Sequence, residues 1–355
     1  MKQLYWLLLG TLPLFASCND SSADSEITDM PVPIRLAPSV EIQPEGMTKA
    51  GNTQPFDGSE FEIEITPVAP VSASDKYEKY TYQLKATKDQ NDNWKLDGTY
   101  GLPSGPLTDL NGETPLWAGR NIETFVEAHA GKLTDFSQNA PLDNQFLEQS
   151  TEANQVAVDF LHYQEKFKPS AKLTDAMNKP FEFDFHHHLS QLNVILKFGT
   201  DYNGINMDQI RTDGIQTVGI FNTVTNYKLT RDAAGLEIVT PGVLTQNHTF
   251  PNTTGGDILT GVEYIRPLVT VSADGKSLLM KAMLIPQALK AGTELIILRL
   301  KKLNGNGFVS GDTWFIYELP KDETFEGGYS YQLTLQIGAG TTTRSATILQ
   351  KGDWQ

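Results

Sequence analysis

Three consecutive histidines, His186-His187-His188, are the first residues in this sequence whose type suggests chemistry. Imidazole nitrogens bind zinc and other transition metals, usually as part of a set of three or four protein ligands. Successive side chains of a strand point to opposite faces, so only His186 and His188 could share an ion. The run therefore predicts the partly exposed end of a strand, and we expect no metal.

A second group of residues resembles the opening of a calcium loop. Residues 89–93, Asp-Gln-Asn-Asp-Asn, place oxygen-bearing side chains at alternate positions. An EF-hand loop needs glycine at its sixth position and glutamate at its twelfth. This sequence has Trp94 and Tyr100 there. The segment therefore favours a hairpin turn over a calcium site.

The common signatures of catalysis and of phosphate binding are absent from the sequence. It contains no Gly-x-Ser-x-Gly, His-Glu-x-x-His, Gly-x-Gly-x-x-Gly or Gly-x-x-x-x-Gly-Lys-Ser/Thr motif. Such spacings position nucleophiles, zinc ligands or phosphate-binding loops. The paired carboxylates of a glycosidase are neighbours in space rather than in sequence, so an extracellular hydrolase stays as a second alternative. We expect no enzyme, no catalytic residue and no cofactor.

The only cysteine, Cys18, follows a short apolar segment at the N-terminus. Residues 1–18 begin with a positive charge, continue through an apolar run and end in Ala16-Ser17-Cys18, as secretory signal peptides do. The run is shorter than the roughly 20 residues of a membrane-spanning helix. Its end is similar to a lipobox, which predicts that Cys18 is lipidated and anchors the mature chain through acyl chains such as palmitate. The alternative is an ordinary signal peptide followed by a free thiol.

The composition indicates an extracellular protein. The formal net charge is −15 and the pI is near 4.8, so the chain repels nucleic acid and anionic membrane surfaces. Residues 19–26 are acidic and too poor in apolar side chains to pack, so they predict a tether. Charged residues make up only 20% of the chain, a balance that suits an extracellular β-protein.

Hydrophobic periodicity predicts strands along most of the chain. Residues 61–66, Phe-Glu-Ile-Glu-Ile-Thr, alternate apolar and polar side chains with the period of two that marks a half-buried strand. A hairpin is expected around the turn at Asp89, and one short helix at Ser170–Asn178. Further strands are expected at 121–128, 181–186, 189–198, 215–221, 236–239, 265–271, 278–285, 295–300, 313–319, 329–337 and 346–349. The pattern predicts an all-β fold with few short helices.

A turn-rich segment from Asp201 to Gly204 separates two strand-rich halves. We therefore expect an N-terminal β-sandwich domain over residues 50–200 and a C-terminal one over residues 201–355. Residues 1–18 would precede them as the lipoprotein signal peptide, and residues 19–49 as a tether that carries a removable strand.

Six aromatic side chains raise the question of a sugar-binding platform. They are Trp117, Phe125, Trp314, Tyr317, Tyr329 and Tyr331. Aromatic residues on alternating strands are more often part of a sandwich core. A surface glycan-binding lipoprotein is therefore the first alternative function, and burial or exposure of these side chains distinguishes it.

Four segments, in order along the chain, resemble the fimbrillin family. They are Trp117–Ala128, Phe183–Val194, Leu284–Gln287 and Phe325–Leu335. The resemblance implies two tandem transthyretin-like β-sandwich domains. It also implies a structural and adhesive subunit of a surface pilus, the type V fimbria of Bacteroidales. Such a lipoprotein reaches the outer surface of the outer membrane, where a trypsin-like protease removes an N-terminal strand and a strand from a neighbouring subunit fills the groove.

The strand that this scheme would remove is predicted at residues 32–42. Its apolar side chains alternate, first Val32, Ile34 and Leu36, then Val40 and Ile42. The prolines at positions 33 and 38 lack an N–H group, which predicts an edge strand.

The cleavage arginine that the resemblance implies after this strand is replaced by a lysine. We expect cleavage after Lys49, with Arg35, inside the strand, as the other candidate. The resemblance also implies that the C-terminal residues 341–355 either stay in their own domain or enter a neighbour, and the sequence does not choose between stalk, tip and anchor roles.

The expected partners follow from the same scheme. They are other fimbrial subunits, in a homo- or hetero-polymer, the maturation protease, the outer membrane through the lipid, and a host or bacterial surface ligand. Nucleic acid is excluded by the charge.

Overall fold

The computed structural model describes residues 32–42, 52–68, 78–101, 105–131, 140–141, 144–173, 179–199, 202, 204–224, 226–231, 237–244, 246–250, 259–304, 307–338 and 346–353. Strands dominate these residues and the helices are few and short, which confirms the predicted all-β fold. Over this part of the chain, no helix has the length and apolar character needed to cross a membrane.

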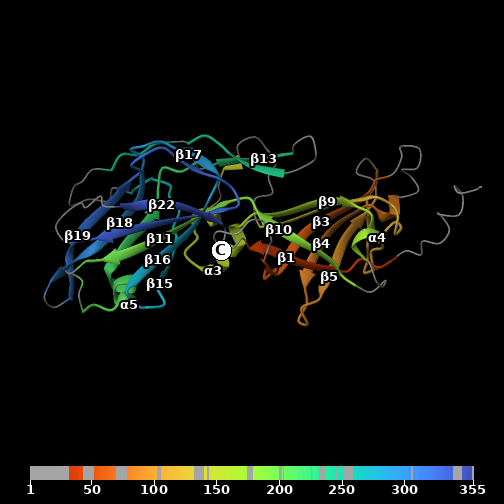
Figure 1. Ribbon diagram of the computed structural model, residues 1–355, viewed down its shortest axis with the longest axis horizontal. Coiled ribbons are helices and arrows are strands. Elements are labelled where there is room, and N and C mark those ends of the chain that lie inside the picture. Colours follow the sequence, from red (N-terminus) through yellow and green to blue (C-terminus); the bar gives the residue numbers. More distant parts are fainter. Residues whose placement is uncertain are drawn as a thin grey trace, which may run out of the picture.

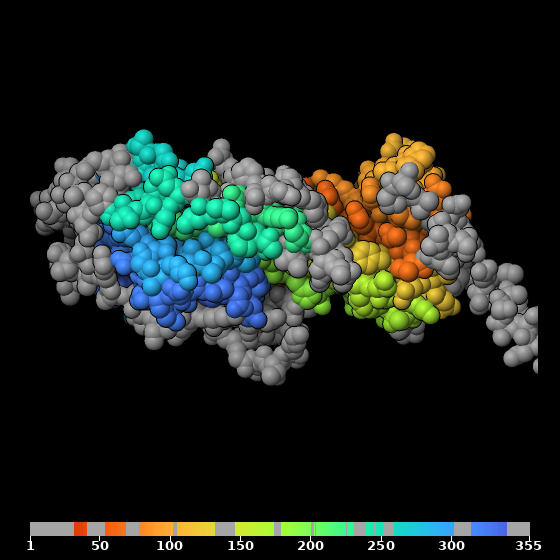
Figure 2. All heavy atoms as spheres, turned by 90° about the horizontal axis from the view of Figure 1, so that it is seen from above, coloured from red at the N-terminus to blue at the C-terminus, as the bar shows by residue number. Residues whose placement is uncertain are grey.

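The molecule is elongated, with an N-terminal half at one end and a C-terminal half at the other (Figure 1). The strands coloured red to yellow form the first half and those coloured green to blue form the second. The view from above separates the same two halves along the long axis (Figure 2). Each half has its own large cluster of buried side chains.

The N-terminal half is one nine-stranded sheet, in the order β2-β1-β10-β9-β7-β3-β4-β5-β6. Its strands are β1 (Leu36–Ile42), β2 (Asn52–Pro55), β3 (Glu60–Pro67), β4 (Tyr82–Lys88), β5 (Trp94–Tyr100), β6 (Thr108–Asp109), β7 (Thr124–Ala130), β9 (Leu161–Phe167) and β10 (Phe181–His187).

This sheet folds over into two layers because β10 joins β9 only at its end. The β10–β9 pairs are His186 with His162 and His187 with Leu161. The preceding part of β10 pairs with β1 instead. The short layer β2-β1-β10 therefore faces the longer layer that runs from β9 to β6.

Alternating side chains fill the space between the two layers. In β3, Phe61, Ile63 and Ile65 are buried, whereas the glutamates between them point outward. The ring of Phe61 lies 5.9 Å from that of Phe183 and 5.5 Å from that of Phe185, measured between centroids. These contacts cross from one layer to the other, as sandwich packing requires.

The C-terminal half has two main sheets that pack face to face. The first has the order β15-β16-β11-β21-β22 and the second β12-β18-β19. Their strands are β11 (Ser190–Phe198), β12 (Ile215–Ile220), β15 (Leu268–Val271), β16 (Ser277–Leu284), β18 (Glu294–Asn304), β19 (Gly307–Glu318), β21 (Tyr329–Ile337) and β22 (Ala346–Asp353). Two small sheets complete it, β17 (Gln287–Leu289) with β20 (Glu323–Phe325), and β14 (Glu237–Pro241) with β13 (Asn226–Arg231) and β8 (Ala140–Pro141).

Strand β18 is buried on both faces. Ile296 and Leu298 belong to the cluster between the two main sheets. Ile297 points the other way and packs with Phe221, Phe250 and Trp314 in a smaller cluster. A strand covered on both sides has a continuous apolar sequence rather than an alternating one.

The helical elements are short. They are the 3₁₀ turn η2 (Glu78–Tyr80), α2 (Asn144–Leu147), α3 (Glu152–Val158), α4 (Pro169–Lys172), α5 (Met207–Gln209) and the π turn η4 (Ile210–Gly214). The helix expected at Ser170–Asn178 corresponds to α4, and residues 174–178 lie outside the described part. Helix α3 was not predicted, although Thr151 accepts a hydrogen bond from the backbone N–H of Asn154 and so provides an ordinary N-cap.

Strand β11 belongs to the C-terminal half, since it pairs with β16 on one side and with β21 on the other. We expected this strand in the N-terminal domain, residues 50–200. We therefore propose that the domain boundary lies just before β11, near His188, rather than at Asp201.

Side chains from the segment after β8 hold that segment against the C-terminal half. Gln149 is fully buried, and its amide donates to the carbonyl oxygens of Phe146 and Met283 and accepts from the N–H of Met283. The amide of Gln155, on α3, donates to the carbonyl oxygen of Lys281. Helix α3 lies at the junction in Figure 1.

Candidate functional site

The candidate removable strand β1 is the central strand of the short layer. It pairs in parallel with β10, with Leu36 opposite Phe181 and Val40 opposite Phe185. On its other side it pairs antiparallel with β2, with Ser39 opposite Pro55. The prediction of an edge strand is therefore wrong. Pro38 has no N–H to donate to the ladder, and its carbonyl oxygen accepts a hydrogen bond from the N–H of Phe56 at 3.2 Å.

Four of the alternating apolar side chains of this segment lie in the core. Val32, Ile34, Leu36 and Val40 are between 3% and 7% exposed and belong to the N-terminal core cluster. The backbone of Ile42 lies in β1 opposite Asn52, and its side chain is outside the described part.

Residues 32–34 extend the contact beyond β1 itself. The N–H of Ile34 donates to the carbonyl oxygen of Pro115, and the N–H of Trp117 donates to that of Val32, both at 2.9 Å. Pro33 and Leu116 thus form a short antiparallel bridge next to Trp117, which is buried. The segment is thus bound along its whole described length.

Loss of β1 would leave a groove with two kinds of unsatisfied surface. The phenylalanine rings at positions 181, 183 and 185 on β10 would lose apolar neighbours, and β10 and β2 would lose their shared hydrogen-bonding partner. Each fully buried side chain of this size contributes about 1.5–3 kcal/mol. Because a domain is stable by only about 5–15 kcal/mol, the loss of several such side chains from the core would strongly destabilise the N-terminal half.

The two candidate cleavage residues differ in what a cut would release. Lys49 lies outside the described residues, in the connection between the end of β1 at Ile42 and the start of β2 at Asn52. Arg35 is exposed and directly precedes β1, and its carbonyl oxygen accepts a hydrogen bond from the N–H of Phe181. A cut at Arg35 leaves β1 joined to β2, whereas a cut after Lys49 separates them. Cys18 also lies outside the described residues.

The three consecutive histidines do not share a site. His186 is exposed, and Nδ1 of His187 lies 2.8 Å from Oδ2 of Asp159. His188 packs against the rings of Phe160 and His162. Burial lowers the pKa of His188 to about 3, with further lowering from the neighbouring histidines. In the described part of the chain, no cluster of histidine, cysteine, aspartate or glutamate could hold a metal ion.

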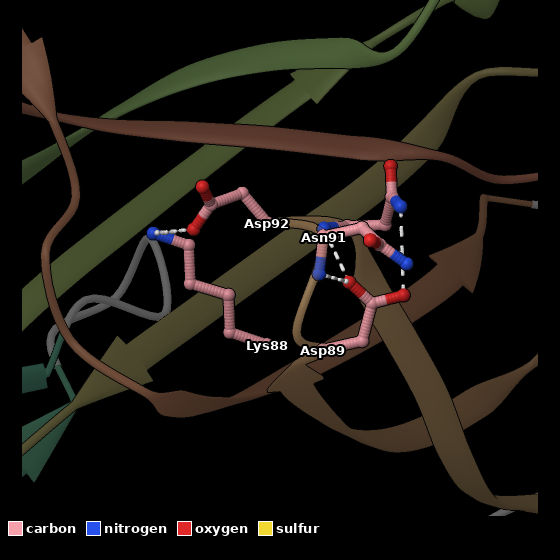
Figure 3. Close-up of polar contacts among 5 residues, drawn as sticks. Lys88, Asp89, Asn91 and Asp92 are labelled. Atoms are coloured by element: carbon pink, nitrogen blue, oxygen red, sulfur yellow. Dashed lines mark hydrogen bonds and ion pairs between the residues drawn. The ribbon is translucent and has the colours of Figure 1, made fainter.

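The segment that resembles a calcium loop is a hairpin turn between β4 and β5, as predicted (Figure 3). One carboxylate oxygen of Asp89 accepts hydrogen bonds from the N–H groups of Asn91 and Asn93, at 2.8 and 2.9 Å. These bonds lower the pKa of Asp89. Asp92 pairs instead with Lys88, at 3.1 Å. The carboxylates thus hold the turn and point to different partners.

The aromatic residues considered for a sugar platform are mainly core residues. Trp117, Trp314, Tyr317 and Tyr331 are all less than 9% exposed. Phe125 and Tyr329 are half-buried. The six side chains are distributed over both halves, so they form no common platform.

The C-terminal strand β22 stays with its own domain here. It pairs antiparallel with β21, from Tyr329 opposite Asp353 to Leu335 opposite Ala346. It is the last strand of the five-stranded sheet, so it occupies an edge. An edge strand can detach without breaking the sheet that remains.

Both the sequence and the fold are similar to those of known proteins. The model of the fimbrillin-like family matches residues 108–350. The fold is similar to that of a candidate cell adhesion protein from Bacteroides ovatus, with a TM-score of 0.50 and 15% identity over 92% of this chain and 99% of that one.

Two further solved structures are similar over 90% of this chain and 99% of their own. They are a fimbrial protein from Bacteroides vulgatus, with a TM-score of 0.41 and 15% identity, and the tip fimbrial protein Mfa3 from Porphyromonas gingivalis, with 0.38 and 9%. No protein among the curated sequences matches at a significant level.

Proposed function

This chain belongs to the fimbrillin-like family, and from that premise we propose that it is an adhesive subunit of a cell-surface fimbria that assembles by donor-strand exchange. The family is one of structural pilus subunits, so the chain is not an enzyme. In the proposal Cys18 carries the lipid that holds the precursor in the outer membrane. A trypsin-like protease then cuts after Lys49, and other fimbrial subunits are the partners.

The observation that carries this proposal is the position of β1 between β10 and β2. A cut in the connection after Ile42 breaks the covalent link between the end of β1 and the start of β2. Residues 18–49 can then leave as one piece, together with the lipid on Cys18. An incoming strand would find backbone partners on both sides, as in strand addition to a sheet.

Repeated exchange would build a filament. The donated strand of one subunit enters the groove of the next, so the contact joins two different surfaces and does not close on itself. Pockets along β10 accept every second side chain, which fixes the register of the incoming strand. The edge strand β22 is a candidate donor. A chain that kept β22 would end the filament as a tip subunit.

The test is tryptic digestion of the chain from Asn19 onward, followed by mass analysis of the new N-terminus and electron microscopy. The expected result is a new N-terminus at Ala50, release of residues 19–49 and growth of polymers. The variant Lys49→Gln should resist this cut and stay monomeric, and the matched variant Arg35→Gln should be cut and polymerise as before.

Two other results would point elsewhere. A clean cut with release of the segment but no polymers supports a terminal role, at the tip or the anchor. A chain that stays intact and monomeric, or one in which the cut segment is never released, contradicts strand exchange. The first alternative, a surface glycan-binding lipoprotein, would then have to be tested on its own.

A further inference from the structure

A cleft of about 630 Å³ lies where the two halves meet. Its floor is the face of the five-stranded sheet that carries Gln191, Asn193 and Lys281. Its walls come from α3 and from the N-terminal half near Val40 and Asp57. The volume lies within the range of roughly 300–1,000 Å³ that is usual for small-molecule sites.

Three polar atoms at this cleft are buried without a hydrogen-bond partner. They are Oε1 of Gln155, Oδ1 of Asp159 and Nε2 of Gln191. Their residues are 4%, 8% and 1% exposed, and all three line the cleft. Buried polar atoms in folded proteins nearly always have partners, so unpaired ones that gather at one cavity indicate a bound molecule or ordered water.

The same cleft also has exposed apolar surface. Five large apolar side chains are exposed in the described part of the chain, and two of them, Val156 and Leu279, line this cleft. A ligand that suits the cleft therefore presents polar groups to the amides and carboxylates and an apolar face to these two side chains.

The unpaired atoms require both donors and acceptors from the ligand. Oε1 of Gln155 and Oδ1 of Asp159 are acceptors, whereas Nε2 of Gln191 is a donor. A hydroxyl group can fill either role. The second carboxylate oxygen of Asp159 already pairs with His187, so only one is open to a ligand.

A peptide strand fits this cleft less well than a sugar does. Strands β11, β16 and β21 on the floor each have a neighbour on both sides, which occupies their backbone groups, whereas β15 and β2 border the cleft as edge strands. Recognition on the floor of the cleft must therefore come from side chains. The carboxylates of Asp57, Glu152 and Asp159 outnumber Lys281 among the lining residues, and this disfavours anionic ligands.

We propose that this interdomain cleft binds a neutral saccharide, whose hydroxyl groups pair with Gln155, Asp159 and Gln191. The site is separate from the six aromatic residues that the sequence suggested. It does not rest on strand exchange, because the cleft is complete in the uncut chain.

The test uses the uncut chain from Asn19 onward on an array of neutral and acidic oligosaccharides, with calorimetry on the glycans that bind. Neutral glycans should bind, and their sialylated or sulfated counterparts should bind at least tenfold more weakly. Gln191→Leu and Gln155→Leu should each lower the affinity at least tenfold. Gln83→Leu, at an exposed glutamine on β4, should leave the affinity unchanged.

A further variant tests the cleft at an exposed position, where a substitution should not disturb folding. Asp57 is exposed at the wall of the cleft, so Asp57→Asn should keep the fold and reduce the discrimination against acidic glycans several-fold. The proposal is overturned if no neutral glycan binds, if acidic glycans bind better, or if the Gln191 and Gln155 variants bind like the unchanged chain. Release of new reducing ends from a bound oligosaccharide would also overturn it, because the site would then be hydrolytic.

Discussion

Val40 of β1 lies opposite Phe185 of β10 in a parallel pair, and both side chains are buried in the same core. This pairing places β1 inside the short layer of the N-terminal sandwich and not at its rim. Removal of β1 therefore separates β10 from β2 and opens the core.

Truncation of a β1 side chain should destabilise the uncut chain. Leu36 is 7% exposed and packs in the core, so Leu36→Ala should cost about 2–5 kcal/mol of unfolding free energy. Arg35 is exposed next to it, so Arg35→Ala should change the stability by no more than about 0.5 kcal/mol. Urea denaturation measures both, and equal effects would show that β1 is not packed as described.

Gln149 should be important for the stability of the C-terminal half, where it holds the segment after β8 against β16. Gln149→Leu removes the partners of the N–H and the carbonyl oxygen of Met283, which lie in the interior. Each buried backbone group left without a partner costs about 1–3 kcal/mol. Thermal and urea unfolding should show this loss, whereas Gln83→Leu, at an exposed position, should not. A Gln149→Leu chain as stable as the parent would contradict the bridging role.

His188 should make the fold sensitive to acid. Burial lowers the pKa of His188 to about 3 in the folded state, against 6.5 for the unperturbed side chain. Between these values the unfolded chain binds the extra proton, so stability is lost as the pH falls from about 6.5 toward 3. One such proton corresponds to a slope of up to about 1.4 kcal/mol per pH unit.

Two variants at neighbouring positions separate this effect from that of other groups. His188→Phe should reduce the loss of unfolding free energy that the parent chain shows between pH 6.5 and 4.5. His186→Gln changes an exposed side chain and should keep the slope of the parent chain. Urea titrations at several pH values provide the measurement, and parallel curves for all three proteins would exclude His188 as the cause.

Calcium should have no effect through the Asp89 turn. The carboxylate of Asp89 already accepts backbone hydrogen bonds, and Asp92 pairs with Lys88. Millimolar calcium chloride should therefore leave the thermal midpoint unchanged. An increase in the midpoint that disappears in Asp89→Asn would identify a calcium site here after all.

Much of the fold could be predicted from local sequence. The alternation of Phe61, Ile63 and Ile65 predicted β3, and the segment from Tyr329 to Ile337 became β21 with the predicted bounds. Period-two patterns and turn residues act over a few positions, so they can be recognised without knowing what a strand pairs with.

The pairing of strands was decided only by the tertiary structure. The prolines in β1 suggested an edge, yet β1 has a partner on each side, and β11 pairs with strands from far along the chain. The cleft between the halves likewise joins Gln155 and Gln191 from separate elements. Local periodicity shows which face of a strand is buried, but pairing depends on packing between distant segments, which no short stretch of sequence encodes.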